Sequence, residues 1–124
     1  MDIDAMEESA RIYYLAEQAA DSGDLDTSER LYRESLTVLD HWKSHNMLAR
    51  VLLRLGKTEE ADEHFRLGYV GHVRNDRVAT DYAERLIVNG NEAEAKRVLN
   101  EVLERNDSYM PARRLLDGMS SSRS

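Results

Sequence analysis

The chain has 124 residues, no cysteine, and 24 acidic against 17 basic residues, which gives a formal net charge of −7. The absence of cysteine excludes disulfides, thiolate metal sites and cysteine nucleophiles. The acidic balance disfavours non-specific attraction to nucleic acid or anionic lipid, and no apolar run approaches the ~18 residues of a membrane-spanning helix. The acidic N-terminus lacks the basic and apolar regions of a signal peptide, so we expect a cytoplasmic protein.

A glycine recurs along the chain at a nearly constant interval of 33 or 34 residues, at Gly23, Gly56 and Gly90. Periods of this length are typical of repeat proteins and have to be sought before any other feature. Each glycine lies between two helix-compatible stretches. We therefore predict that it takes the left-handed conformation just after a helix end, so that each unit is a helix, a tight turn and a second helix.

The helix before each glycine has a packed face, because small or apolar residues recur at i, i+3, i+4 and i+7. The three repeats, at about residues 9–41, 42–75 and 76–108, have on this face Ile12, Leu15, Ala16 and Ala19, then His45, Leu48, Ala49 and Leu52, then Ala79, Tyr82, Ala83 and Leu86. The alanine at the third position in every repeat indicates a close approach of a neighbouring helix.

The helix after each glycine alternates small and large residues at matching places, as interdigitating layers require. These residues are Ser28, Tyr32, Ser35 and Leu36, then Ala61, Phe65, Gly68 and Tyr69, then Ala95, Leu99, Val102 and Leu103. Helix starts are predicted near Asp26, Thr58 and Asn91 from their capping potential.

The chain closes with one further helix, at about residues 109–119, in which Pro111 suits the first helical turn. The Ser-rich residues 120–124 are predicted to be disordered. The prediction is therefore a single domain over residues 1–119, all-α, with three helix pairs and a C-terminal capping helix.

This pattern resembles the tetratricopeptide repeat family, which has a 34-residue period of paired helices. The matching residues are the three glycines, the first-helix faces above, and Ala61 and Ala95 with Ser28 as a small substitute. The usual proline at the repeat boundary is absent. The resemblance implies a right-handed α-solenoid and a non-catalytic scaffold, adaptor or co-chaperone-like factor that binds a peptide or helix of a partner protein in its concave groove.

The residues expected to line this groove lie opposite the packed faces of the first helices. They are Tyr13, Tyr14, Glu17, Lys43, Asn46, Met47, Arg50, Arg54, Arg77, Asp81 and Glu84. Tyrosine and arginine supply contact area, hydrogen bonds and carboxylate pairing at interfaces. Two interpretations of the arginines stay open: they bind acidic groups of a partner, or they pair with the neighbouring Glu17, Asp81 and Glu84.

One branch of the family resembles a clamp for the C-terminal carboxylates of chaperone tails. The corresponding positions here hold Tyr13, Glu17, Met47, Arg77 and Asp81, and only Arg77 keeps the positive charge. A dicarboxylate would meet two acidic side chains, so we expect that partner class to be rejected. No nucleic acid or membrane partner is expected.

A second hypothesis is a self-assembly module that forms homo-oligomers through its terminal helices. We expect neither catalysis nor a cofactor, because no nucleophile and base can be assembled from the sequence. His41 and His45 have the i, i+4 spacing of a metal pair, but no third ligand is evident and no metal site is predicted. Trp42 could pack between repeats or remain exposed.

Overall fold

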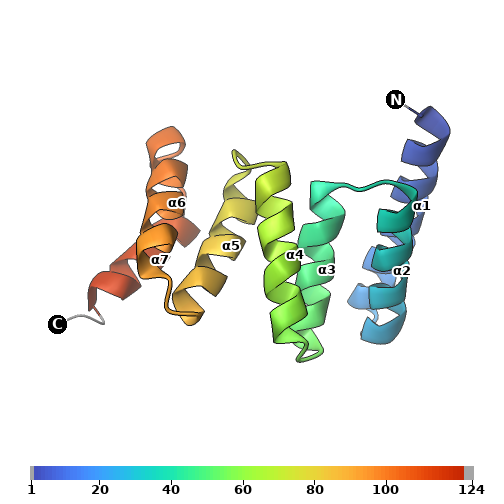
Figure 1. The fold of residues 1–124 in the computed structure, drawn as a ribbon, viewed down its shortest axis with the longest axis horizontal. Helices are drawn as coiled ribbons and strands as arrows, with labels where there is room; N and C mark the ends of the chain where they lie inside the picture. Colours follow the sequence, from blue (N-terminus) through green and yellow to red (C-terminus); the bar gives the residue numbers. More distant parts are fainter. Residues whose placement is uncertain (1, 122–124) are drawn as a thin grey trace. The chain divides into compact units, whose positions relative to one another are not determined.

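A computed structural model describes residues 2–121, which form seven helices and no strand (Figure 1). The helices are α1 (Ile3–Asp21), α2 (Leu25–Val38), α3 (Trp42–Arg54), α4 (Thr58–Gly71), α5 (Asp76–Val88), α6 (Glu92–Arg105) and α7 (Met110–Ser121). The all-α prediction with three helix pairs and a closing helix is confirmed. None of these helices is both long and apolar enough to cross a membrane.

The structure divides between Gly71 and His72 into two compact units. In the first unit, α1 packs on α2, α3 packs on α4, and the two pairs meet through α2 and α3. In the second unit, α5 packs on α6, and α7 covers part of both. Each unit is described on its own below.

The three recurring glycines make the predicted turns. Gly23, Gly56 and Gly90 have φ values of 86°, 80° and 84°, and they are the described residues with positive φ. In the second repeat, Gly56 N–H donates to the carbonyl of Leu53 at 3.1 Å and Lys57 N–H donates to that of Leu52 at 2.9 Å. These two hydrogen bonds close the last turn of α3. A Cβ at Gly56 would be strained, because this residue has the left-handed conformation.

The helix starts differ in detail from the prediction. Asp24, not Asp26, caps α2 by accepting a hydrogen bond from Thr27 N–H at 3.2 Å. Asn91 precedes α6 but makes no side-chain capping bond, and Thr58 is the first helical residue of α4. In α7, Pro111 lies in the first turn as predicted. That helix continues to Ser121, and the remaining residues of the predicted disordered tail, 122–124, lie outside the described residues.

The alanines predicted at the third position of each packed face are fully enclosed, whereas Ala19 on the same face of α1 is half-buried. Ala16, Ala49 and Ala83 each have 0% of their surface exposed, and Ala61 and Ala95 on the second helices are equally buried. Such residues allow helix axes to approach closely. Between α1 and α2 the approach is close enough for a hydrogen bond from the Ser28 hydroxyl to the carbonyl of Ala16 at 2.8 Å.

Leu15 departs from the prediction of a packed residue, because 40% of it is exposed. Its counterparts in the next repeats are Leu48, with 0% exposed, and the half-buried Tyr82. The sequence period predicts the same burial at matching positions of all three repeats. Among the described residues no repeat lies before α1 against which this position could pack, and its leucine is at the surface of the structure.

Trp42 is half-buried and packs against the other helix of its own repeat, an arrangement that neither of the two interpretations describes. It stands at the start of α3 against the two glycines near the end of α4. A Cβ added to Gly71 would lie 2.6 Å from the Trp42 Cβ, and one added to Gly68 would lie 3.2 Å from the Trp42 carbonyl oxygen. Gly71 therefore leaves room for the Trp42 side chain, and Gly68 lets the backbone at the start of α3 lie close to α4.

Candidate functional site

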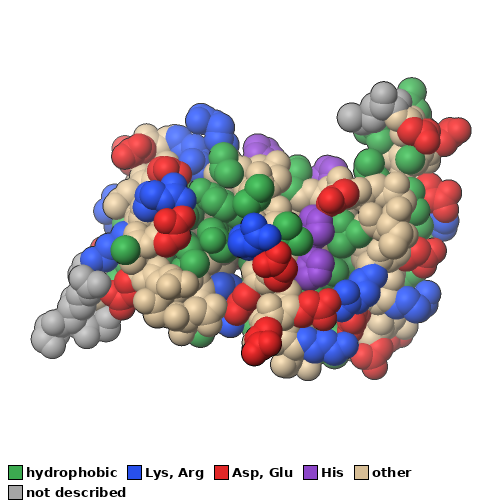
Figure 2. All heavy atoms as spheres, viewed as in Figure 1, with side chains coloured by type: hydrophobic (Ala, Val, Ile, Leu, Met, Phe, Trp, Pro, Cys, Tyr) green, Lys and Arg blue, Asp and Glu red, His purple; other side chains and the backbone are tan. Residues whose placement is uncertain are grey.

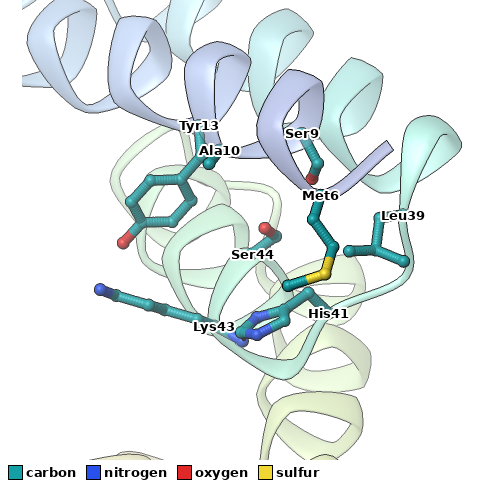
Figure 3. A pocket seen from close by; sticks show the side chains of 8 residues that line it. All are labelled: Met6, Ser9, Ala10, Tyr13, Leu39, His41, Lys43 and Ser44. Carbon is teal, nitrogen blue, oxygen red and sulfur yellow. Dashed lines mark hydrogen bonds between the residues drawn. The ribbon is translucent and has the colours of Figure 1, made fainter. Parts of the chain in front are cut away.

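A surface pocket of about 250 Å³ lies between α1 and α3 in the first unit (Figure 3). Its lining comes from α1, from the connection between α2 and α3, and from the first turn of α3. The lining residues are Met6, Ser9, Ala10, Tyr13, Leu39, His41, Lys43 and Ser44. The walls are mostly apolar, and Lys43 is the only Lys, Arg, Asp or Glu in this lining.

Buried serines fix α1 against α2 behind the pocket. The Ser35 hydroxyl donates to the carbonyl of Ser9 at 3.0 Å, the Ser9 hydroxyl donates to the carbonyl of Ser35 at 3.2 Å, and the two hydroxyls are 2.9 Å apart. Both residues are at most 5% exposed. Because these bonds satisfy the polar groups of both helices away from water, they position the α1 wall of the pocket firmly.

The opposite wall is held by the start of α3. His41 is its N-cap, and its Nδ1 accepts a hydrogen bond from Lys43 N–H at 3.1 Å. The His41 ring also lies with its centroid 5.4 Å from that of Trp42. Partial burial, with the charge of Lys43, lowers the pKa of His41 below its usual range. The imidazole therefore faces the pocket in its neutral form at neutral pH.

Lys43 provides the positive charge at the rim. Its Nζ lies 5.2 Å from the centroid of the Tyr13 ring, a cation–π contact, and Figure 3 shows its side chain extending across the opening toward that ring. Tyr13 in turn contacts the fully buried Tyr32 edge to face, with ring centroids 5.4 Å apart. An anionic group that enters the pocket would thus meet Lys43 beside an aromatic surface.

The predicted groove residues of the first unit are distributed unevenly. Tyr13 and Lys43 line the pocket, and Lys43, Met47, Arg50 and Arg54 lie along one face of α3 at helical spacing. Met47 and Arg50 are half-buried and Arg54 is exposed. On α1, Glu17 is half-buried, and the exposed Tyr14 accepts a hydrogen bond from Gln18 at 3.3 Å.

Asn46 does not lie on the exposed face that was predicted for it. It is 3% exposed and packs against α4, where a Cβ on Gly68 would come within 3.3 Å of its Cβ and backbone nitrogen. The glycine lets the two helices approach so closely that a position one step from the packed face is enclosed as well. Asn46 is therefore a packing residue of the α3–α4 interface.

The remaining predicted residues lie on α5 in the second unit. Arg77 and Glu84 are exposed there, and Asp81 is half-buried. Asp81 and Glu84 line a separate depression with Thr80 and three residues of α7. Burial and the nearby Asp81 raise the pKa of Tyr109.

Sequence reasoning missed five of the pocket residues, which are Met6, Ser9, Leu39, His41 and Ser44. Met6 precedes Ala10 by one helical turn and could have been found by extending the α1 stripe toward the N-terminus. Ser44 stands beside Lys43 but belongs to the buried side of α3. Leu39 and His41 lie in the connection between helices, where no helical period points to them.

The two histidines considered as a metal pair have different neighbours. His41 caps α3, whereas the His45 ring points to α4 and to Asp40. No group of three or more His, Cys, Asp or Glu side chains suited to a metal ion was found among the described residues. His45 occupies the predicted packing position and is largely enclosed, with 13% of its side chain exposed.

The fold is that of a helical-repeat protein whose first unit has a surface pocket between α1 and α3. The tetratricopeptide repeat sequence model matches residues 13–34 and 43–66. Together with the structural similarities below, these two matches support the tetratricopeptide repeat fold for the chain. The comparison with curated protein sequences gave no match. The tetratricopeptide repeat is generally a non-catalytic module for protein–protein interaction.

Three solved structures illustrate the similarity of fold. The first TPR of Spaghetti (RPAP3), bound to the HSP90 peptide SRMEEVD, is 15% identical, with a TM-score of 0.83 over 94% of this chain and 93% of that one. The Yersinia enterocolitica type III secretion chaperone SycD, in complex with a peptide of the translocator YopD, is 21% identical, with a TM-score of 0.71 over 97% and 90%. A tetratricopeptide repeat protein from Parabacteroides merdae is 20% identical, with a TM-score of 0.75 over 86% and 43%.

Proposed function

We propose that the first unit binds a segment of a partner protein in the groove between α1 and α3. An apolar side chain of the segment occupies the pocket, and a carboxylate close to it in sequence pairs with Lys43. The observation that carries this proposal is the composition of the pocket lining, in which apolar walls are combined with a single lysine. The peptides bound to the first TPR of Spaghetti and to SycD support a ligand of this class.

The pocket volume of about 250 Å³ suits one large side chain, such as leucine, methionine or phenylalanine. Enclosing such a side chain contributes roughly 1.5–3 kcal/mol. An ion pair at a solvated rim adds at most about 1 kcal/mol. We therefore expect the apolar side chain to supply most of the affinity and Lys43 to select segments with an acidic residue beside it.

Arg50 and Arg54 extend the proposed binding face along α3. They follow Lys43 by about two and three helical turns on the same side of the helix. Further acidic groups of a bound segment would meet these arginines after the pocket has been filled. Reversing both charges should weaken binding of such a segment, and an unchanged affinity would restrict the site to the pocket itself.

A chaperone-tail dicarboxylate fits these residues less well than a segment with one apolar anchor. Tyr13, Glu17 and Met47 hold the clamp positions on α1 and α3, and none of them is a cation. The half-buried Glu17 would oppose a second carboxylate in this part of the groove. The likeness to the HSP90-peptide complex therefore supports the binding mode of an extended segment, not the same peptide.

The test is a selection of peptides from a random display library with the purified chain. We expect the selected peptides to share an apolar residue with an acidic residue close by. Ala10→Phe places a ring at the exposed pocket wall and should abolish their binding, whereas Ala93→Phe, at an exposed alanine of α6, should leave it intact. Selected peptides that bind Ala10→Phe as well as wild type would place the ligand outside the pocket.

A second candidate function is self-assembly through α1, because this helix exposes several large apolar side chains. Ile3 is 68% exposed, Tyr14 57%, Met6 42% and Leu15 40%. Leu15 occupies a position that is packed in the second repeat, so a second copy could cover it. Sedimentation of wild type and of Leu15→Asp tests this. A monomer at all concentrations up to about millimolar would exclude it, since a stable interface should be populated there.

A further inference from the structure

Helices α3 and α4 are joined by two histidines whose rings meet edge to edge. His45 Nδ1 lies 2.9 Å from His64 Nδ1, the ring planes are inclined by 24°, and the ring centroids are 5.2 Å apart. The centroid separation is the nitrogen–nitrogen distance extended by one ring radius at each end. The two Nδ1 atoms therefore point directly at one another, and this geometry suits a single shared proton, with one ring as donor and the other as acceptor.

The outer nitrogens of the pair face carboxylates. Asp40 Oδ1 lies 2.6 Å from His45 Nε2, and Glu60 Oε2 lies 3.8 Å from His64 Nε2. A proton on His45 Nε2 satisfies Asp40 and leaves His45 Nδ1 as an acceptor. His64 Nδ1–H is then the donor between the two rings.

Charged side chains continue this line of contacts to α2. Glu60 pairs with Arg33 at 2.6 Å, Arg33 pairs with Glu29 at 2.8 Å, and Lys57 pairs with Glu29 at 2.8 Å. Figure 2 shows histidine side chains over α3 and α4, with acidic and basic side chains beside them. The histidine pair thus belongs to a continuous polar connection between the first and the second helix pair.

The pair has a limit on the protons that it can hold. Three protons are compatible with the observed contacts, because two lie on the outer nitrogens and one is shared between the rings. A fourth would place two N–H groups against each other across 2.9 Å. Because only 13% of the His45 side chain and 15% of the His64 side chain are exposed, the rings cannot separate without disturbing the α3–α4 interface.

We propose that His45 and His64 form a pH-sensitive link that holds α3 against α4 at neutral pH and opens in mild acid. α3 also supplies Lys43 and Met47 to the proposed binding face, so opening of the link would change the groove. That consequence rests on the proposed function, whereas the link itself does not.

The groups around the histidine pair determine how the stability of the link changes with pH. Burial, followed by the charge of His45, lowers the pKa of His64 below its ordinary value of 6.5. A group whose pKa is lowered on folding contributes stability above its unfolded pKa and loses it as the pH falls through the folded pKa. Within the pair, the third proton is accommodated on His64 Nε2 beside Glu60, and the fourth breaks the contact between the two Nδ1 atoms. The groups that face the pair are Asp40 and His41 from the α2–α3 connection, Arg33 from α2, and Glu60 and Glu63 from α4.

Trp42 is the only tryptophan of the chain, and it contacts Gly71 of α4, so its fluorescence reports on the α3–α4 interface. His41 lies beside its ring and would quench it when protonated, so the experiment uses a His41→Asn background, in which asparagine can still cap α3. We expect a red shift of the emission between about pH 7 and about pH 5. Adding His64→Gln should remove the shift, because the amide donates a hydrogen bond without titrating, and adding His72→Gln in the second unit should leave it unchanged.

Nitrogen-15 NMR of the wild type tests the shared proton without any substitution. A scalar coupling between His45 Nδ1 and His64 Nδ1 should be present at about pH 7 and lost at about pH 5, while circular dichroism shows that the helices remain. The proposal is overturned if this coupling is absent at neutral pH or persists in acid, or if the fluorescence shift survives in His64→Gln. Neither readout involves a ligand, so a failure of the proposed binding function would leave both results interpretable.

Discussion

Replacing Gly71 by alanine should destabilise the first unit, because the added Cβ would overlap with Trp42. Gly71 is the last residue of α4, and the added Cβ would lie 2.6 Å from the Trp42 Cβ, where an ordinary contact is 3.4–4 Å. The Cβ of Trp42 is fixed by the backbone of α3 and cannot turn away as the end of a flexible side chain can. One of the two helices must therefore shift by about 1 Å to restore a van der Waals separation.

The size of the effect follows from two opposing contributions. Overpacking of an ordered interface costs about 1–3 kcal/mol. The loss of glycine's freedom in the unfolded chain returns about 0.4–1 kcal/mol. We expect Gly71→Ala to lower the free energy of unfolding of the first unit by about 1–2 kcal/mol. Gly118→Ala provides the control, because that helical glycine has nothing within 4 Å of the added Cβ, and it should raise stability by up to about 1 kcal/mol.

Urea unfolding measures both changes. Trp42 fluorescence follows the first unit, and far-ultraviolet circular dichroism follows all helices, so the separate unfolding of the two units would be detected. The comparison uses transition midpoints at constant slope. If Gly71→Ala were as stable as the wild type, the contact between Trp42 and the end of α4 would not have the closeness on which this reasoning depends.

Three further substitutions test other parts of the structure. Gly56→Ala should cost about 1–2 kcal/mol in urea unfolding through its φ of 80° alone, with peptide affinity unchanged; equal stability would contradict the turn. Tyr32→Phe should be neutral or stabilising by up to about 1 kcal/mol, because the buried hydroxyl has no hydrogen-bond partner among the described residues; a clear loss in thermal unfolding would reveal one. A hydrogen bond from Lys57, the largest effect, and one from Arg33 hold the pKa of Glu29 below its ordinary 4.5, although burial opposes them. The wild type should therefore lose stability as the pH falls below that value. Glu29→Gln should lose less over the same range, and parallel acid-unfolding curves would contradict the ion pairs.

The turns and the helix pairs could be predicted because their causes are local. A left-handed residue after a helix end favours glycine whatever surrounds it, and Gly23, Gly56 and Gly90 all have this conformation. The packed faces follow from the helical period in the same way. Leu15 shows where the period fails, since its burial depends on a preceding repeat and not on its own helix.

The pocket and the histidine pair could not be predicted, because they depend on distances between residues far apart in the sequence. His45 and His64 belong to different helices, and nothing local indicates that their rings meet. Asn46 was assigned to the exposed side because the period cannot show how closely α4 approaches at Gly68. Leu39 belongs to a connection with no period at all, although it completes the wall of the pocket.

The proposed role of Lys43 is tested most directly by a charge swap between the protein and a peptide selected by the wild type. Lys43→Glu should weaken binding of the acidic peptide about 5-fold or more, in keeping with the loss of one ion pair and the gain of a repulsion. The same peptide with lysine in place of its acidic residue should bind Lys43→Glu more tightly than it binds the wild type. Recovery of affinity by the matched pair would support the assignment of the carboxylate to Lys43. An affinity that is insensitive to both changes would contradict the proposed groove between α1 and α3.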